Sequence, residues 1–107
     1  MKKIEAVIRH YKLSDVQQAL LEAGIHAMTV TEARGIGRKQ NPKDFCADFL
    51  PKLKLDIVVL DSEVDAAVAA IAKARTGKTG DGLIWVSNLE EAIRIRTGET
   101  GETAVRP

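Results

Sequence analysis

The chain has 107 residues, with 16 Lys and Arg against 15 Asp and Glu, a formal net charge of +1, and 45% hydrophobic residues. A chain of this length buries roughly 65% of the surface that it exposes when unfolded, so we expect residues 1–107 to form a single domain. The near-neutral charge argues against a nucleic-acid partner. The longest aliphatic run, Ile57–Leu60, is too short to cross a bilayer, so we expect no membrane insertion.

The reactive residue types are few. The single cysteine, Cys46, excludes an intrachain disulfide, and the N-terminal residues enter a strand-like pattern directly, which together favour a reducing cytoplasm. His10 and His26 lack the spacing of a ligand pair, so we expect no metal site. We also expect no enzyme, no catalytic residues and no cofactor, because no Ser-His, Cys-His or paired-carboxylate constellation is apparent.

The first third of the chain predicts a β-α-β unit. Branched residues at Lys3–Arg9 predict a strand. The apolar spacing of Val16–Ala23 predicts an amphipathic helix, which a Ser14 capping box opens and Gly24 ends. The β-branched segment Met28–Ala33 predicts the second strand of the unit.

A second unit repeats this order. Alternation at Leu53–Val59 predicts a strand, Ser62 caps a helix with the apolar face Val64–Ile71, and Leu83–Ser87 predicts the closing strand. Two consecutive units imply a ferredoxin-like α+β fold, in which two helices cover one face of a four-stranded antiparallel sheet. The chain is too short to cover the other face, so we expect identical subunits to cover it for each other.

Three irregular stretches are the candidates for binding, because loops on a rigid scaffold carry most binding groups. The first is the long connection Gly35–Pro51, and the second is the glycine-rich segment Thr76–Gly82. The second segment is not a P-loop, because Ala72 replaces the required earlier glycine and the segment leads from a helix to a strand. Its glycines fit either a simple turn or backbone amides that face an anion.

The third stretch is the C-terminal tail. Asn88, with Glu91 three residues later, predicts a short helix before it. Arg94 and Arg96 would project to the same side if Ile95 continues as a strand. Two neighbouring guanidiniums suit a phosphate, although a solvated face beside the nearby glutamates fits these residues equally well.

Six segments, in this order and spacing, closely resemble the PII signal-transduction proteins: Met1–Ala6, Thr29–Glu32, Gly35–Arg38, Asp48–Lys52, Thr76–Gly82 and Ile93–Glu99. The resemblance covers nearly the whole chain. It implies a homotrimer that binds adenine nucleotides in the clefts between subunits and regulates a partner protein, a transporter or an enzyme. The regulatory element would be a mobile T-loop at about residues 37–50, with a glycine loop at 76–82 and a tail at 97–107.

By matched position, the resemblance assigns a nucleotide site. Adenine and ribose would contact Val7, Thr29, Gly35, Asp56 and Val58, and the phosphates would contact Gly37, Arg38, Gly80, Asp81, Gly82, Arg94 and Arg96. Apolar side chains and a hydroxyl can hold a purine, whereas glycine amides and guanidiniums complement phosphate oxygens. Val7, Val58 and Thr29 also fit a purely structural role in the sheet.

The chain departs from the family pattern at three places. Lys39 replaces a glutamine that helps to hold Mg-ATP with 2-oxoglutarate, and an ammonium group cannot coordinate a metal. Leu83 replaces a lysine that favours the terminal phosphate. The T-loop is several residues shorter and lacks the segment with the modified tyrosine. These departures predict that ADP or AMP binds at least as tightly as ATP, although Lys39 can also pair with phosphate directly.

The same losses make the chain similar to shortened PII-like proteins associated with carboxysomes, which respond to adenine nucleotide and bicarbonate. In that interpretation, Arg38, Lys39 and Lys52 form a small cationic pocket for bicarbonate or another anion, and the role lies in inorganic-carbon metabolism. Both lysines also fit as solvated loop residues. The alternatives are a nitrogen-regulatory PII protein that senses ATP, ADP and 2-oxoglutarate, and a passive trimeric interaction module.

Overall fold

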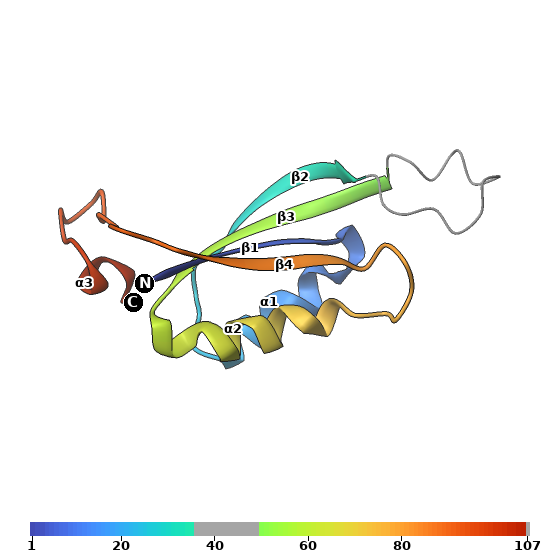
Figure 1. Cartoon of the computed structure of the whole chain (residues 1–107), viewed down its shortest axis with the longest axis horizontal. Helices are drawn as coiled ribbons and strands as arrows, with labels where there is room; N and C mark the ends of the chain where they lie inside the picture. The colour runs from blue at the N-terminus through green and yellow to red at the C-terminus, as the bar shows by residue number, and fades with distance from the viewer. Residues whose placement is uncertain (36–49, 107) are drawn as a thin grey trace.

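The computed structural model describes residues 1–35 and 50–106 as one sheet with helices on one side (Figure 1). The strands are β1 (Lys2–Arg9), β2 (Thr29–Gly35), β3 (Leu50–Val59) and β4 (Gly82–Asn88). They lie in the order β2-β3-β1-β4, and each neighbouring pair is antiparallel. The expected ferredoxin-like α+β architecture is confirmed.

Two helices, α1 (Leu13–Glu22) and α2 (Val64–Ile71), cover one face of the sheet (Figure 1). Short 3-10 turns flank them at His10–Lys12, Asp61–Glu63 and Ala72–Ala74, and a last short helix, α3 (Glu102–Val105), lies near the C-terminus. No helix within the described ranges is long and apolar enough to cross a membrane.

The core lies between the sheet and the two helices. Alternate residues of the central strands face it and are buried, while α1 and α2 contribute residues at helical spacing; the set is Ile4, Ala6, Ile8, Leu55, Ile57, Val59, Val16, Leu20, Ala67, Ala70 and Ile71. Each fully buried Ile or Leu side chain contributes roughly 1.5–3 kcal/mol relative to an exposed one. This burial fixes the register of the sheet, because a slip by one residue would turn the apolar set outward.

The helix-free face carries the intervening residues. Glu5 of β1 lies opposite Asp56 of β3 and Trp85 of β4, so all three side chains share this face. Lys54 bridges the two carboxylates, at 3.1 Å from Glu5 and 3.9 Å from Asp56. The surface therefore combines paired charges with the half-exposed Trp85 and the exposed Val58.

The helix starts differ from the sequence prediction. Ser14 lies inside α1 and does not cap it, because the 3-10 turn at His10–Lys12 runs directly into the helix. Ser62 likewise lies within a 3-10 turn. There, the Glu63 side chain accepts a hydrogen bond from the Leu60 backbone N–H at 2.9 Å and so closes the start of the helical segment. At the other end of α1, the predicted stop is confirmed: Gly24 has a positive φ of 81°.

The short helix predicted from Asn88 is wrong. β4 extends to Asn88, whose side chain accepts a hydrogen bond from Lys2 of the neighbouring strand and is therefore not a helix cap. The condition that Ile95 continues as a strand is not met, because Ile93 forms only an isolated bridge with Thr100. Arg94 and Arg96 therefore do not lie on a strand that would direct both side chains to the same side.

Gly82 is the position where the sheet depends most directly on a missing side chain. It has a φ of 107°, and a Cβ atom built there would lie 1.7 Å from the Val7 carbonyl oxygen. Gly24 also has a positive φ, but a Cβ there would meet no atom within 4 Å. A comparison of Gly24 with Gly82 therefore separates the free-energy cost of a left-handed backbone from that of a steric clash.

We expect Gly82→Ala to destabilise the fold by more than about 3 kcal/mol, because β4 must move away from β1. The control variant Gly24→Ala should cost only about 1–2 kcal/mol, the price of a left-handed backbone alone. Urea unfolding at equal protein concentration would measure both, and equal losses would contradict a steric role for Gly82.

Candidate functional site

The glycine segment is held together by one carboxylate. Asp81 accepts hydrogen bonds from the backbone N–H groups of Thr76 and Gly77, each at 2.8 Å, and from the Thr76 hydroxyl. Gly77, Gly80 and Gly82 all have positive φ values, which favour glycine. The segment therefore folds as a turn closed by the side chain of Asp81, which the sequence analysis assigned to the phosphates.

Two cations on neighbouring strands support this turn. Arg9 of β1 donates from Nε to Asp81 at 3.0 Å and from Nη2 to the Thr79 carbonyl at 2.8 Å. Lys52 of β3 lies opposite Arg9 in the sheet and donates to the carbonyl of Gly80. Lys52 is only 8% exposed, so it is not a solvated loop lysine.

The charges in this cluster shift each other's protonation equilibria. Burial, and then the neighbouring Arg9 guanidinium, lower the pKa of Lys52, while the Asp81 carboxylate opposes that shift. The Thr76 hydroxyl, followed by Arg9 and the backbone N–H groups, holds the pKa of Asp81 well below its usual range. The ionised Asp81 carboxylate thus pairs with Arg9 and also acts on Lys52 through its charge.

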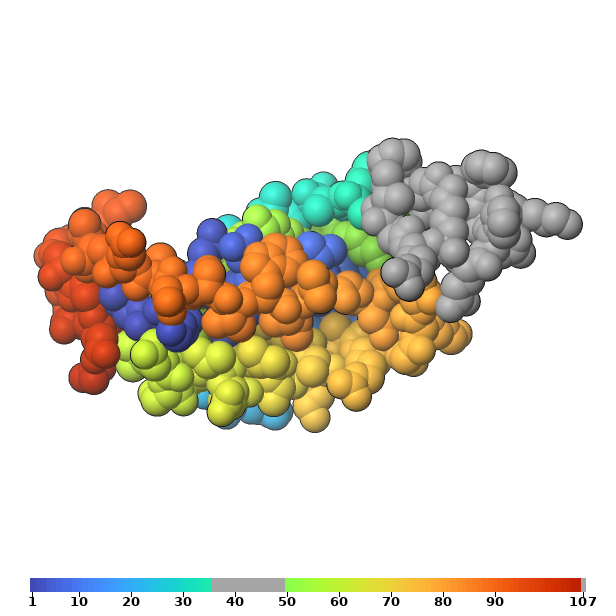
Figure 2. Space-filling model, in the orientation of Figure 1, coloured from blue at the N-terminus to red at the C-terminus, as the bar shows by residue number. Residues whose placement is uncertain are grey.

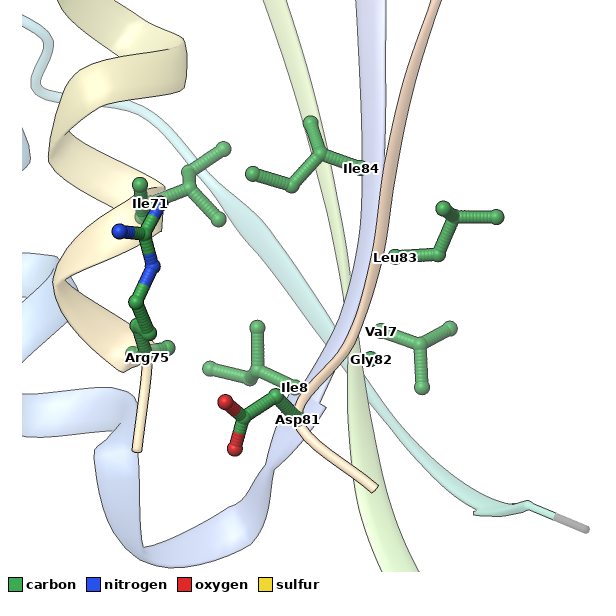
Figure 3. A pocket seen from close by; sticks show the side chains of 10 residues that line it. Val7, Ile8, Ile71, Arg75, Asp81, Gly82, Leu83 and Ile84 are labelled. Carbon is green, nitrogen blue, oxygen red and sulfur yellow. The ribbon is translucent and has the colours of Figure 1, made fainter. Parts of the chain in front are cut away.

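Val7, which was predicted to contact the adenine or ribose, lies on the helix-free face near the glycine segment. Figure 3 shows Val7 and Leu83 pointing away from α2, whereas Ile8 and Ile84 point toward it. Val7 and Leu83 are paired across β1 and β4, and Leu83 is 67% exposed. Gly35 is close by, because a Cβ on it would lie 3.3 Å from Cγ of Lys52.

A cavity of about 240 Å³ opens on the other side of β4. Its lining includes Ile71, Ala72, Arg75 and Ile84, between the end of α2 and the sheet (Figure 3). Val7 and Leu83 also line this cavity (Figure 3), so it reaches the strands that carry the apolar pair.

The remaining predicted residues lie farther along the strands. Thr29 and Asp56 are paired in the sheet and sit one pleat beyond Val7, and Val58 lies one pleat farther still. Arg94 follows the end of β4 and donates from Nη2 to the Ala104 carbonyl at 2.9 Å and to the Arg106 carbonyl, while Arg96 is exposed.

The glycine segment and the arginine pair lie at opposite ends of the protomer (Figures 1 and 2). β4, Gly82–Asn88, connects the two ends and spans about 20 Å at ~3.3 Å per residue. One phosphate group cannot bridge that distance. Gly80, Gly82 and Arg94 therefore cannot contact the same phosphates within one chain.

Some predicted residues lie outside the described ranges. These are Gly37, Arg38 and Lys39, together with Cys46 and nearly all of the predicted T-loop. The described residues contain no group of three or more His, Cys, Asp and Glu side chains that could hold a metal ion.

Arg9 is the supporting residue that the sequence analysis missed. Arg9 lies at the end of the first strand, two residues after Val7. Because side chains alternate along a strand, this spacing could have placed Arg9 on the same face as Val7. The contact with Asp81, 72 positions away, follows only from the sheet order, which places β4 beside β1.

Comparison with known proteins agrees with this geometry. The family model for nitrogen regulatory protein P-II matches residues 1–99. Proteins named nitrogen regulatory protein P-II from Mesorhizobium japonicum, Bradyrhizobium diazoefficiens and Haemophilus influenzae are 52%, 51% and 50% identical, over 98% of this chain and 100% of theirs. The alignments span 112 positions, so the 107-residue chain lacks positions that these relatives have.

Fold and similarity together define a regulatory signalling protein and not an enzyme. The chain belongs to the P-II family of nitrogen regulatory proteins. The relatives resemble it over their full length, and their names support nitrogen regulation more directly than the carboxysome-associated interpretation.

The glycine turn should make stability depend on pH. Asp81 has a folded-state pKa below its ordinary value of about 3.9, so its contribution is present above pH ~4 and is lost as the pH falls below that value. We expect Asp81→Asn to unfold more readily than the wild type at pH 7 and the difference to shrink between about pH 4 and pH 2. Thermal unfolding across this range, with the exposed Glu90→Gln as a matched control, would measure it. A difference that stays constant with pH would contradict this role.

Proposed function

We propose that this protein is a nitrogen-regulatory P-II signalling protein whose nucleotide site is assembled from two protomers. The observation that carries the proposal is the separation of the predicted phosphate ligands. The glycine segment lies at one end of β4 and Arg94 and Arg96 lie beyond the other, so a site that uses both requires a second copy.

The helix-free face supports assembly into a trimer. It carries the half-exposed Trp85 and the exposed Val58 and Leu83, and no helix of the described ranges covers it. Its charged side chains are already paired within the chain, through Lys54 and Glu5 at 3.1 Å. Burial of this face against identical copies would remove apolar area from water without leaving an isolated charge.

An adenine nucleotide suits the chemistry of the two half-sites. The partly buried Val7 and the exposed Leu83 form an apolar pair beside the glycine segment, and a purine can pack against such a surface. The backbone of Gly80–Gly82, Arg38, and the arginines of a second protomer supply groups that complement phosphate. Thr29 and Asp56 are paired across β2 and β3 and supply polar groups for the ribose.

Leu83 supports a preference for ADP or AMP over ATP. Its side chain is exposed beside Val7, at the start of β4, where a lysine would add a cation for a terminal phosphate. Cations on the neighbouring strands are already engaged: Arg9 with Asp81, Lys52 with the Gly80 carbonyl, and Lys54 with Glu5. ATP therefore gains less from its third phosphate than it would with a lysine at this position.

Lys52 is the described residue best placed for a small anionic effector. It donates to the Gly80 carbonyl of the glycine segment, and Arg9 pairs with Asp81, so the cluster of Arg9, Lys52 and Asp81 has an excess of positive charge. An anion at this cluster, with Arg38 and Lys39 from the T-loop, would be 2-oxoglutarate in nitrogen signalling. Bicarbonate is the second candidate, which the losses at Lys39 and Leu83 favour.

The expected output is control of a partner protein in the cytoplasm through the T-loop at about residues 37–50. A passive trimeric module would need neither the glycine turn nor the paired arginines. Measurable nucleotide binding therefore separates a sensor from a passive module.

Subunit mixing would test the shared site. We expect Arg38→Ala and Arg96→Ala each to weaken ADP binding by about 1.5–3 kcal/mol, because each removes a charge-assisted phosphate contact. Co-assembled subunits of the two variants should recover high-affinity sites, since one protomer keeps the intact loop end and its neighbour keeps the intact arginine end. Calorimetry on the mixed assembly would count these sites. Exposed Lys73→Ala, on the helical side, is the matched control, and mixtures without recovery would place both half-sites in one chain.

Ligand preference would separate the signalling alternatives. We expect ADP or AMP to bind at least as tightly as ATP, without Mg-dependent synergy between ATP and 2-oxoglutarate, and Leu83→Lys to restore some preference for ATP. Calorimetric titrations with and without magnesium, 2-oxoglutarate and bicarbonate would test each of these expectations. ATP binding that magnesium and 2-oxoglutarate strengthen would contradict the effect assigned to Lys39 and Leu83, and would show ordinary nitrogen sensing.

A further inference from the structure

The C-terminal residues fold back onto Arg94. Its Nη2 atom donates to the carbonyl of Ala104 at 2.9 Å and to the carbonyl of Arg106. These carbonyls lie at the end of α3, where the backbone carbonyls of a helix have no partner within the helix. Arg94 therefore caps α3 with the same guanidinium that the proposed function assigns to phosphate.

Gly101 directs the chain back toward Arg94. Its backbone N–H donates to the Ala92 carbonyl at 3.0 Å and to the Glu91 carboxylate at 2.9 Å. Gly101 has a φ of 65° and a ψ of −145°, a region that residues with a side chain rarely occupy. The return of α3 to Arg94 thus depends on a glycine at this position.

The docked tail blocks two-point binding by Arg94. A guanidinium holds a phosphate at two points either end-on, through Nη1 and Nη2, or side-on, through Nε and Nη2. Both modes use Nη2, which the tail occupies. The Nε atom is buried and has no hydrogen-bond partner within the part of the chain that the structure describes.

We propose that Gly101–Arg106 is an autoinhibitory clasp, which occupies Arg94 in the absence of nucleotide and is displaced when a nucleotide phosphate binds there. The proposal rests on the proposed function, because it requires Arg94 to be a phosphate ligand. Within the described residues, the docked clasp leaves the buried Nε of Arg94 without a hydrogen-bond acceptor, and a bound phosphate would supply one. The free energy needed to release the clasp from Arg94 is therefore small.

The clasp couples nucleotide binding to the position of α3. By linkage, any change that weakens the docked tail must tighten nucleotide binding, and nucleotide must in turn release the tail. The signal would emerge at the end of the protomer opposite the glycine segment Thr76–Gly82 (Figure 1).

Two full-length variants would test the clasp. Gly101→Ala disfavours the backbone conformation that returns α3 to Arg94, whereas Thr103→Ala alters an exposed residue of α3 and serves as the control. We expect Gly101→Ala to bind ADP about three- to tenfold more tightly by calorimetry, because the competing closed state is depopulated. Thr103→Ala should stay within about twofold of the wild type.

Hydrogen exchange on the wild type provides an independent measurement. The backbone N–H groups of Ala104 and Arg106 donate to Gly101 and Glu102 at 3.0 and 3.1 Å, and they should exchange faster with saturating ADP. ADP-independent exchange at both amides, or unchanged or weaker ADP binding by Gly101→Ala, would overturn the clasp. If the wild type binds ADP and Arg94→Ala weakens that binding, the proposed function stands even when the clasp fails. A wild type that binds no ADP overturns both.

Discussion

The Asp81 carboxylate joins three segments that are far apart in the sequence. It accepts hydrogen bonds from Thr76 and Gly77 after α2, pairs with Arg9 at the end of β1, and itself directly precedes β4. The turn that it closes sets where β4 begins, and Gly82 then allows β4 to pass against the Val7 carbonyl. The positions of Leu83 and of the glycine amides on the helix-free face follow from this one carboxylate.

The antiparallel sheet also explains why the proposed nucleotide site is divided into two half-sites. β4 begins at the glycine segment and carries the chain to the far end of the protomer, where Arg94 and the tail lie (Figure 1). The tail turns back toward Arg94, which caps α3. In the proposed function, ligand binding is thereby tied to assembly, because the arrangement of neighbouring copies determines whether the two sets of phosphate-binding residues face each other.

Much of the fold could be predicted from local patterns. The alternation of Ile4, Ala6 and Ile8 identified the first strand, and the positive φ of Gly24 confirms the predicted end of α1. The helix starts were harder to predict, because a backbone turn precedes α1, in which Ser14 lies, and the Glu63 side chain rather than that of Ser62 closes the start of the second helical segment.

The site was less predictable than the fold. Motifs drew attention to the glycine segment and to the arginines, but they did not show that Asp81 holds the turn or that Arg94 holds the tail. Lys52 fitted a solvated residue in the sequence, and its burial follows from packing beneath Gly80. Such contacts join distant positions, so they depend on strand order and not on neighbouring residues.

The strand order has a consequence for the isolated protomer. β4 is an edge strand, and it carries the exposed or half-exposed Leu83, Trp85 and Val86. An apolar edge with unpaired backbone groups is a template for further strands and therefore an aggregation hazard. The solubility of newly made chains therefore depends on a protein concentration that lets them assemble with other copies. A substitution that separates the protomers would yield precipitate sooner than a well-behaved monomer.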